Sequence, residues 1–311
     1  MIARREFLKK STLACAAIWG QRFVPQEEDF NIIDIHQHTN YAGRSHEELL
    51  THQRAMGVKH TILLPAGTPS FGASTHFGKS NGLQVNSTGN DVCMEIAGRY
   101  PGEFYFGANE VPDLQGADKE IEKYLKKGAK AIGELKFGVK ADGKPMERIY
   151  RLAEAYNVPV LLHWQFGMYT YGYEDFHKIL QKFPKVNFIG HAQSWWANID
   201  KNHNDQSVLY PRGKVTPGGI TDRLLADYPN MFADMSAGSG LSALTRDEEH
   251  ARGFLVRHQD KLLYGSDCDD RTGTGNGCTG IQAIQKIKEL SPDLAVVRKI
   301  LHGNAAKLFR I

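Results

Sequence analysis

The chain has 311 residues, of which 41% are hydrophobic and 23% are charged, and its formal net charge is +3. This length suits one large α/β domain, and the small net charge without a long basic segment argues against nucleic acid as a partner. No apolar run approaches the roughly 20 residues of a membrane-spanning helix, so we expect a soluble domain.

Residues 1–20 are predicted to be an export signal and not part of the fold. A charged segment containing Arg4 and Arg5 is followed by an apolar stretch of about ten residues, as in secretory signals. With the following Glu-Phe-Leu-Lys it resembles the twin-arginine motif, although Ala3 stands where Ser or Thr is usual. The alternative is the amphipathic start of an ordinary helix. We expect the twin-arginine export machinery as a partner and a periplasmic location, with membrane anchoring if the signal is not cleaved.

From residue 31 to residue 311, strands are predicted to alternate with helices. Eight short runs of β-branched or apolar residues are predicted strands: Asn31–His38, His60–Pro65, Phe104–Ala108, Ala129–Phe137, Val158–Trp164, Val186–His191, Met231–Met235 and Leu262–Asp267. Segments with apolar residues three and four apart are predicted helices, such as Glu47–Met56, Glu120–Lys127, Met146–Tyr156, Phe176–Phe183, Ile220–Tyr228 and Glu248–His258. Eight βα units close into a (β/α)8 TIM barrel. An open doubly wound sheet is the competing fold, but no glycine-rich dinucleotide turn follows the first strand.

The first predicted strand ends in three polar residues, Asp34, His36 and His38. Side chains alternate across a strand, so these three point the same way. That direction is the barrel interior if Ile33 and Ile35 face the helices. Two imidazoles one pleat apart can hold a single ion, whereas the alternative is a pair of surface histidines.

Four further strands end in groups that bind metals. Glu134, His163, His191 and Asp267 end the fourth, fifth, sixth and eighth predicted strands. The carboxyl ends of barrel strands meet at one face, where active sites of this fold lie. Imidazoles and carboxylates are ligands of zinc, manganese and iron. We therefore predict a site for one or two divalent ions, with zinc favoured.

The order Asp-x-His-x-His, Glu, His, His, Asp resembles that of the amidohydrolase superfamily. The segment Leu301–Phe309 is similar to the closing segment of its "amidohydrolase 2" branch. The resemblance implies that His36, His38 and Asp267 bind the metal. It further implies that His163 is another ligand.

The same resemblance gives His191 one of two roles, as a ligand of a second ion or as an acid/base group beside a single one. In physical terms, Asp267 takes a proton from the attacking water and passes it to the leaving group. His191 helps to polarise the carbonyl under attack. Asp34 is expected to orient an imidazole by hydrogen bonding.

The fourth strand leaves several roles open. Glu134 and Lys136 are two residues apart, so both side chains can face the barrel. Among the relatives that the resemblance suggests, some bridge two metals with a carboxylate at this strand, others use a carbamylated lysine, and many bind one ion without a bridge. Lys136 is also a possible anchor for a substrate carboxylate. We favour Glu134 near the metal and a single ion.

Two long connections, Gly67–Asn90 and Gln193–Gly219, follow strand ends and are expected to border the site. Trp195 and Trp196 in the second one either wall a substrate pocket or pack the insertion onto the barrel. Arg271, after the last strand, is a weaker candidate for binding an anionic substrate.

The predicted function is hydrolysis of an ester, lactone or amide bond in a small molecule by metal-activated water. A metal-dependent lyase, either a decarboxylase or a hydratase acting on a carboxylate, is the first alternative. A non-catalytic exported binding protein is the second. Homo-oligomers are possible. Cys268 and Cys278 either form a disulfide or remain free thiols.

Overall fold

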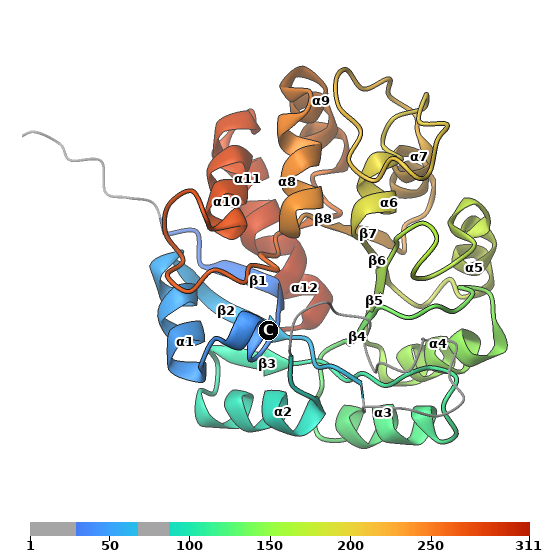
Figure 1. Cartoon of the computed structure of the whole chain (residues 1–311), viewed down its shortest axis with the longest axis vertical. Helices are drawn as coiled ribbons and strands as arrows, with labels where there is room; N and C mark the ends of the chain where they lie inside the picture. Colours follow the sequence, from blue (N-terminus) through green and yellow to red (C-terminus); the bar gives the residue numbers. More distant parts are fainter. Residues whose placement is uncertain (1–28, 68–86) are drawn as a thin grey trace, which may run out of the picture.

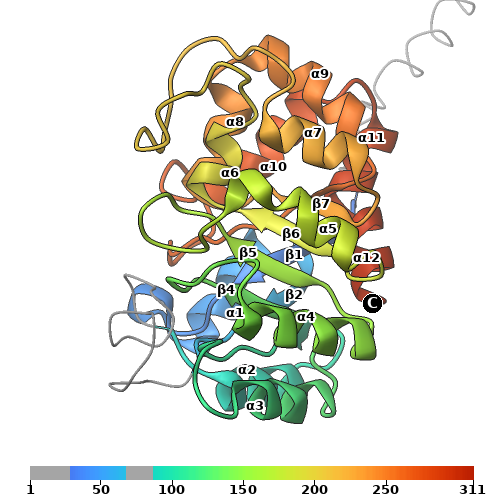
Figure 2. The ribbon, with the colours of Figure 1, turned by 90° about the vertical axis from the view of Figure 1, so that its right-hand side faces the viewer.

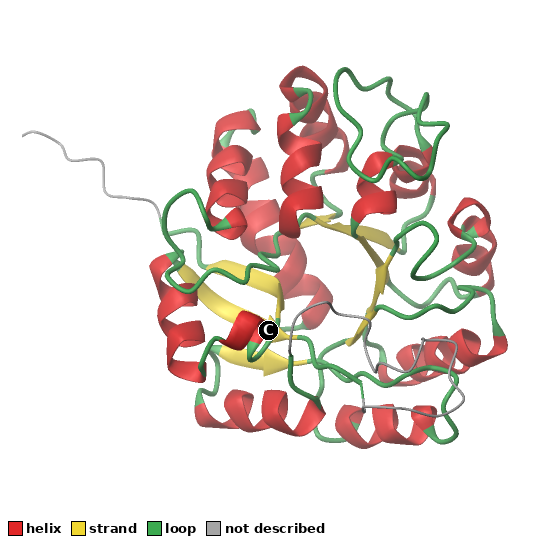
Figure 3. Cartoon of the chain, viewed as in Figure 1, coloured by secondary structure: helices red, strands yellow, loops and turns green. Residues whose placement is uncertain are grey.

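The computed structural model describes residues 29–67 and 87–311. This part of the chain forms a ring of parallel strands surrounded by helices, as Figures 1 and 3 show. The predicted export signal and most of the connection Gly67–Asn90 lie outside the described residues. Within them, no helix has the length and hydropathy needed to cross a membrane. The predicted (β/α)8 barrel is confirmed.

Each of the eight predicted strands is present, and most are shorter than predicted. Their bounds are β1 Ile32–Gln37, β2 Val58–Leu63, β3 Phe104–Phe106, β4 Ile132–Leu135, β5 Val160–His163, β6 Phe188–His191, β7 Met231–Asp234 and β8 Leu262–Leu263. All pair in parallel, in the orders β1-β2-β3 and β4-β5-β6-β7-β8. Strand β8 keeps only two of its six predicted residues, because the chain leaves the sheet before it reaches Asp267.

Backbone hydrogen bonds join the two sheets into a closed ring. Between β3 and β4, Ala108 N donates to Ala131 O at 2.9 Å. Between β1 and β8, Ile35 N donates to Tyr264 O at 3.2 Å, and Asp267 N donates to His36 O at 2.8 Å. The last bond places Asp267 beside the metal-binding motif of β1.

The outer layer consists of helices that follow the strands. Its α-helices are α1 His46–Ala55, α2 Asn90–Arg99, α3 Ala117–Leu125, α4 Lys144–Tyr156, α5 His177–Lys182, α6 Gln193–Ala197, α7 Ile220–Asp227, α8 Ala237–Thr245, α9 Glu248–His258, α10 Thr279–Leu290, α11 Leu294–Arg298 and α12 Asn304–Phe309. Shorter helical turns are η1 Tyr41–Gly43, η2 Tyr173–Asp175 and η3 Lys299–Gly303. Helix α1 begins with a capping box, in which Ser45 accepts from Glu48 N and the Glu48 carboxylate accepts from Ser45 N. Figure 2 shows the loops after the strands on one side and α12 on the opposite side.

In β1 the apolar and polar side chains do not alternate between the two faces as predicted. Ile33 and Ile35 do not join the large core beneath the outer helices. They pack instead with one apolar residue from each of β2, β5, β6 and β8, with Leu64 and Ala131 beside β2 and β4, and with α12. The pairing of β1 with β2 shifts register between Asp34 and Gln37, which breaks the alternation predicted from the sequence. The prediction that Ile33 and Ile35 face the outer helices is therefore wrong, although His36 and His38 still meet the other strand ends.

Candidate metal centre

Four side chains bring potential ligand atoms together at the carboxyl ends of β1, β4 and β8. His36 Nε2 lies 3.1 Å from His38 Nε2. Glu134 Oε2 lies 3.7 Å from His36 Nε2 and 3.5 Å from His38 Nε2. Asp267 Oδ1 lies 3.7 Å from each of these two nitrogens. Ligand atoms about 2.0–2.2 Å from one tetrahedral ion lie roughly 3.3–3.6 Å apart, so these separations of 3.1–3.7 Å are close to the spacing around a single divalent cation.

The hydrogen bonds of the two imidazoles also indicate a cation. His36 Nδ1 lies 2.6 Å from Asp234 Oδ2, and His38 Nδ1 lies 2.8 Å from Leu64 O. Because both oxygens accept, each imidazole donates from Nδ1 and its Nε2 lone pair faces the other imidazole. Two lone pairs at 3.1 Å repel unless a proton or a metal cation lies between them, and the raised pKa of His36 allows a proton to take this place when no metal is bound. Asp267 Oδ1 is buried and has no hydrogen-bond partner among residues 29–67 and 87–311. The donor set therefore fits a divalent metal ion.

The charges of the buried groups also favour a cation at this position. Burial disfavours protonation of His36, but the carboxylates of Asp267 and Asp234 outweigh it and raise the pKa of His36 well above its usual value. Burial also opposes ionisation of Glu134, yet the neighbouring His163 holds the pKa of Glu134 well below its usual range. Buried carboxylates require a compensating positive charge. The protein thus attracts a cation to the point where the four ligand atoms meet.

Asp234 and Ser236 support the site from β7, and the sequence analysis did not identify either residue. Asp234 Oδ2 accepts from His36 and lies 3.2 Å from His191 Nδ1. Ser236 Oγ lies 3.1 Å from the same His191 nitrogen and donates to Asp234 Oδ2 at 2.8 Å. One carboxylate therefore orients two imidazoles, which is a common arrangement behind metal-binding histidines. Burial opposes ionisation of Asp234, but the charges of His36 and His191 prevail and lower the pKa of Asp234.

His191 and His163 lie beyond the four ligand atoms. His191 Nε2 is 3.6 Å from Glu134 Oε1 and 3.7 Å from Asp267 Oδ2, the second oxygens of those carboxylates. His163 Nδ1 lies 2.5 Å from Glu134 Oε1, and its Nε2 lies 3.2 Å from Gln165 Oε1. Burial and the charge of Lys136 lower the pKa of His163 to about 4. His163 therefore contacts Glu134, whereas the family resemblance implied that His163 itself binds the metal.

This arrangement favours one ion over two. His36 takes part in two potential ligand groups, one with His38 and Asp267 and the other with Glu134 and His191. Its Nδ1 is bonded to Asp234, so only Nε2 is free to bind, and one lone pair serves one ion. A second ion between Glu134 and His163 would need their atoms farther apart than the 2.5 Å observed.

Asp34 is buried, but its contacts differ from the expected imidazole. Its carboxylate accepts from Ser266 N at 2.9 Å, from Ser266 Oγ at 2.5 Å and from His36 N at 3.0 Å. Burial raises the pKa of Asp34 despite these bonds. Asp34 therefore fixes the backbone of β1 against the segment after β8, and Asp234 performs the orienting role that the sequence assigned to Asp34. Gly265 is required here, because a Cβ at this position would lie 2.6 Å from Asp234 Oδ1.

A buried arginine connects the loops after β1 and β8. The Arg44 side chain donates to Cys268 O at 3.1 Å, to Asp270 O at 2.7 Å and to Gln37 Oε1 at 2.6 Å. Only 1% of Arg44 is exposed, so these charge-assisted bonds are shielded from water. They hold together the two segments that contribute three of the four ligand atoms.

The four residues considered for substrate binding occupy different surroundings. Trp195 and Trp196 are buried, and a Cβ on Gly190 would lie 2.4 Å from the Trp195 ring. The Trp195 ring thus packs against β6, whereas Trp196 packs against Phe254 of α9 and donates to Asp234 O. Lys136 is half-buried and its ammonium lies 5.5 Å from the centre of the Tyr169 ring. Arg271 is exposed and pairs with Glu48 at 2.8 Å.

Changing Asp234 to Asn should lower metal affinity or activity about 10–100-fold, as expected for loss of a carboxylate that orients metal-binding histidines. The amide cannot balance the charges of His36 and His191, and it offers a donor where a proton acceptor is needed. Metal titration and activity on the same preparation measure both effects. The control is Asp222→Asn, because Asp222 forms a similar 2.5 Å pair with His258 away from the site. Equal losses in the two variants would contradict a specific role for Asp234.

Comparison with known proteins gives one family and several structural neighbours. The family model described as "Amidohydrolase" matches residues 33–311. No curated protein matches the sequence. The solved structure of an uncharacterized TIM-barrel protein from Bordetella bronchiseptica is similar with a TM-score of 0.60 at 16% identity, covering 90% of this chain and 98% of that one.

Two further neighbours have assigned activities in their names. A probable 2-pyrone-4,6-dicarboxylic acid hydrolase from Acinetobacter baumannii, with citric acid bound, has a TM-score of 0.55 at 14% identity, covering 90% of this chain and 100% of that one. A 5-carboxyvanillate decarboxylase from Novosphingobium aromaticivorans, complexed with manganese and a nitrobenzoic acid, has a TM-score of 0.51 at 14% identity, covering 85% of this chain and 79% of that one. At these identities the neighbours establish the fold alone.

Proposed function

Because the chain belongs to the amidohydrolase family, we propose that it is a metal-dependent hydrolase that cleaves an ester, lactone or amide bond of a small molecule. One observation carries the proposal. Asp267 places one carboxylate oxygen among the four ligand atoms and the other 3.7 Å from His191 Nε2. The Asp267 carboxylate thus lies next to both the proposed ion position and His191, the proposed acid/base group.

The chain supplies the groups that hydrolysis needs. His36, His38, Glu134 and Asp267 would hold a divalent ion, and the ion would supply Lewis acidity toward water and the scissile carbonyl. Asp267 accepts the proton of the attacking water and delivers it to the leaving group. His191, held by Asp234 through Nδ1, presents Nε2 to the developing negative charge.

Substrate selection is proposed to lie in the loop after β5. A cavity of about 520 Å³ is lined there by Trp164, Gln165, Phe166, Tyr171 and Ser194, among others. Gln165 also contacts His163, which in turn contacts the ligand residue Glu134, so the cavity lies close to the candidate metal centre. Its volume suits a small organic molecule.

Decarboxylation is the second candidate, and Lys136 is the observation that favours it. The ammonium of Lys136 is close enough to the cluster to lower the pKa of His163. It could therefore hold a substrate carboxylate beside the ion. One structural neighbour is named as a decarboxylase and contains manganese, which makes manganese a metal to test alongside zinc and iron.

The protein should be stripped with a chelator and reloaded with zinc, manganese or iron before it is screened. One panel contains lactones, esters and amides, and a second contains aromatic and unsaturated carboxylates. Metal-dependent turnover of the first panel supports hydrolysis. Carbon dioxide release from the second without hydrolysis of the first would replace this proposal with decarboxylation, and tight substrate binding without turnover would favour the binding protein.

We also propose that residues 1–20 direct export through the twin-arginine machinery. Replacing both Arg4 and Arg5 with Lys should keep the protein in the cytoplasm, because the charge is retained but the motif is lost. Cell fractionation measures the outcome. The matched control replaces Lys9 and Lys10 with Arg, which also retains charge and leaves the pair intact. Unchanged periplasmic recovery of the first variant would contradict the proposal.

A further inference from the structure

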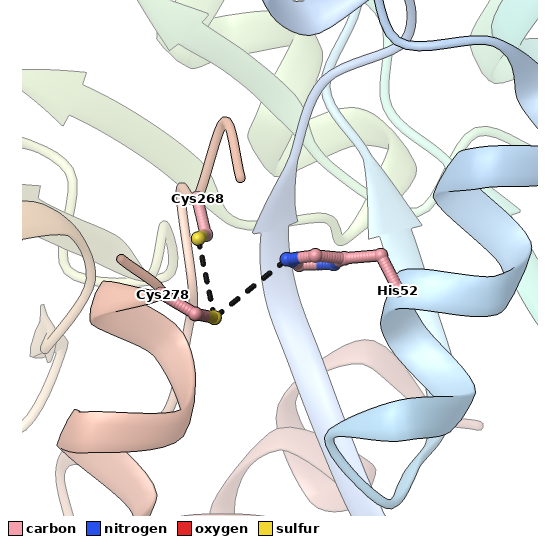
Figure 4. A group of neighbouring side chains, drawn as sticks. All are labelled: His52, Cys268 and Cys278. Carbon is pink, nitrogen blue, oxygen red and sulfur yellow. Dashed lines mark hydrogen bonds between the residues drawn. The ribbon is translucent and has the colours of Figure 1, made fainter. Parts of the chain in front are cut away.

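A second group of potential metal ligands lies outside the site described above. His52 on α1, Cys268 after β8 and Cys278 at the start of α10 converge in the interior, as Figure 4 shows. Their exposed fractions are 0%, 1% and 0%. The Cys268 and Cys278 sulfurs are 3.3 Å apart, and Cys278 Sγ is 3.7 Å from His52 Nε2. The three ligand atoms all lie within 4.8 Å of one another.

We propose that these three residues form a structural zinc site. Two cysteine thiolates and an imidazole are ligands that Zn²⁺ prefers. Two thiolates and a neutral imidazole carry a net charge of −2, so a bound Zn²⁺ makes the centre neutral. Neutrality matters because an uncompensated charge is costly in an interior as completely buried as this one. A monovalent ion would leave negative charge behind.

The spacing is close to that of such a site. Two sulfurs about 2.3 Å from one tetrahedral zinc ion lie roughly 3.8 Å apart, and a sulfur and an imidazole nitrogen roughly 3.6 Å apart. The sulfur–nitrogen separation of 3.7 Å agrees with this geometry, and the sulfurs, 3.3 Å apart, would need to separate by about 0.5 Å to share one ion. Met56 Sδ lies 3.5 Å from Cys278 Sγ. A disulfide would instead require the sulfurs to approach to about 2.05 Å.

The position of the cluster explains what an ion would do there. Cys268 directly follows Asp267, and Cys278 caps α10 by accepting from Ile281 N at 3.4 Å. His52 belongs to α1, which packs beneath β1 and β2. A zinc ion would therefore fasten both ends of the loop 268–278 to α1. It would hold the loop whose first part carries Asp267, without contributing to the chemistry itself.

Cobalt substitution tests the site without using activity. The reduced, metal-free full-length protein is titrated with Co²⁺, which gives an intense near-ultraviolet thiolate-to-cobalt band only when cysteine sulfur is bound. We expect the band to reach its full intensity at no more than two equivalents of cobalt, because both sites bind the ion, and to disappear when Zn²⁺ displaces it. The band should persist in the variant His36→Asn/His38→Asn, because that variant lacks only the other site.

Variants then assign the ligands. Cys278→Ser should abolish the band and remove one zinc per chain in elemental analysis, whereas Cys93→Ser, which alters a buried cysteine outside the cluster, should change neither. His52→Gln should weaken zinc binding at least 10-fold, whereas His46→Gln on the same helix should not. These comparisons use zinc content and spectra of the soluble fraction, so loss of stability alone does not produce the expected pattern.

Two results would overturn the proposal. One is the absence of a thiolate band in the reduced wild-type protein at saturating cobalt. The other is a mass two hydrogens below that of the reduced chain in protein purified with zinc and without reductant, with the disulfide mapped to Cys268 and Cys278. The second result would show that Cys268 and Cys278 stabilise the loop by a disulfide bond and not by a bound ion.

Discussion

Replacing Asp267 with Asn should reduce turnover by about 10²–10⁴-fold, the range expected when a positioned acid/base group is lost. The amide keeps the size of the side chain but cannot accept the proton of water. It is also a weaker metal ligand, so metal affinity should fall as well. Rates measured at saturating metal separate these two effects, because only the loss of proton transfer remains there.

The control for Asp267→Asn is Asp269→Asn, which changes an exposed carboxylate of the same loop. Its rate should stay within about twofold of that of the wild type, since surface substitutions rarely disturb a site. If Asp267→Asn kept most of its turnover at saturating metal, another group would have to move the proton. His191 would then be the first candidate to test.

The double variant His36→Asn/His38→Asn should bind one divalent ion fewer per chain than the wild type and should show no metal-dependent turnover. The two imidazoles supply half of the four ligand atoms, and their Nε2 lone pairs are what the cation offsets. The wild type should also gain stability with metal, by about 2.7 kcal/mol at 100 times the dissociation constant, whereas the variant should gain none from this site.

Elemental analysis and thermal unfolding with and without metal measure these effects. His60→Asn is the matched control, because His60 bonds to Gly102 O on the opposite side of β2 and belongs to neither ligand group. An unchanged metal count in the double variant would contradict the assignment. A loss of two ions would show that two metals depend on these histidines and would contradict the single-ion arrangement.

The fold could be predicted from the sequence because its signals are local. Each strand is a short run of apolar or β-branched residues, and several helices show their own periodicity. The family prediction is also confirmed. The strand lengths were less predictable, since the last residue that pairs depends on the neighbouring strand. The faces of β1 were predicted wrongly because a register shift is a property of two strands together.

The site was only partly predictable for the same reason. Glu134, His191 and Asp267 are brought near His36 and His38, as their places at strand ends suggested. Asp234 is the last residue but one of the predicted strand Met231–Met235, so a signal existed, but the family pattern contains no residue at that position and Asp234 was overlooked. Two further details depend on contacts between residues far apart in sequence. One is the nitrogen of His163 that faces Glu134, and the other is the carboxylate that orients His36.

The hydrogen bonds of Arg44 connect some of the loops at the carboxyl end of the barrel and leave another loop out. The two sets of loops should therefore differ in how well they tolerate substitutions. The bonds of Arg44 fix the loops after β1 and β8 to each other, and those loops carry three of the four ligand atoms. The loop after β5, which lines the 520 Å³ cavity, shares none of these bonds. New substrates could therefore be accommodated by altering the β5 side alone, while the ion-holding side stays the same.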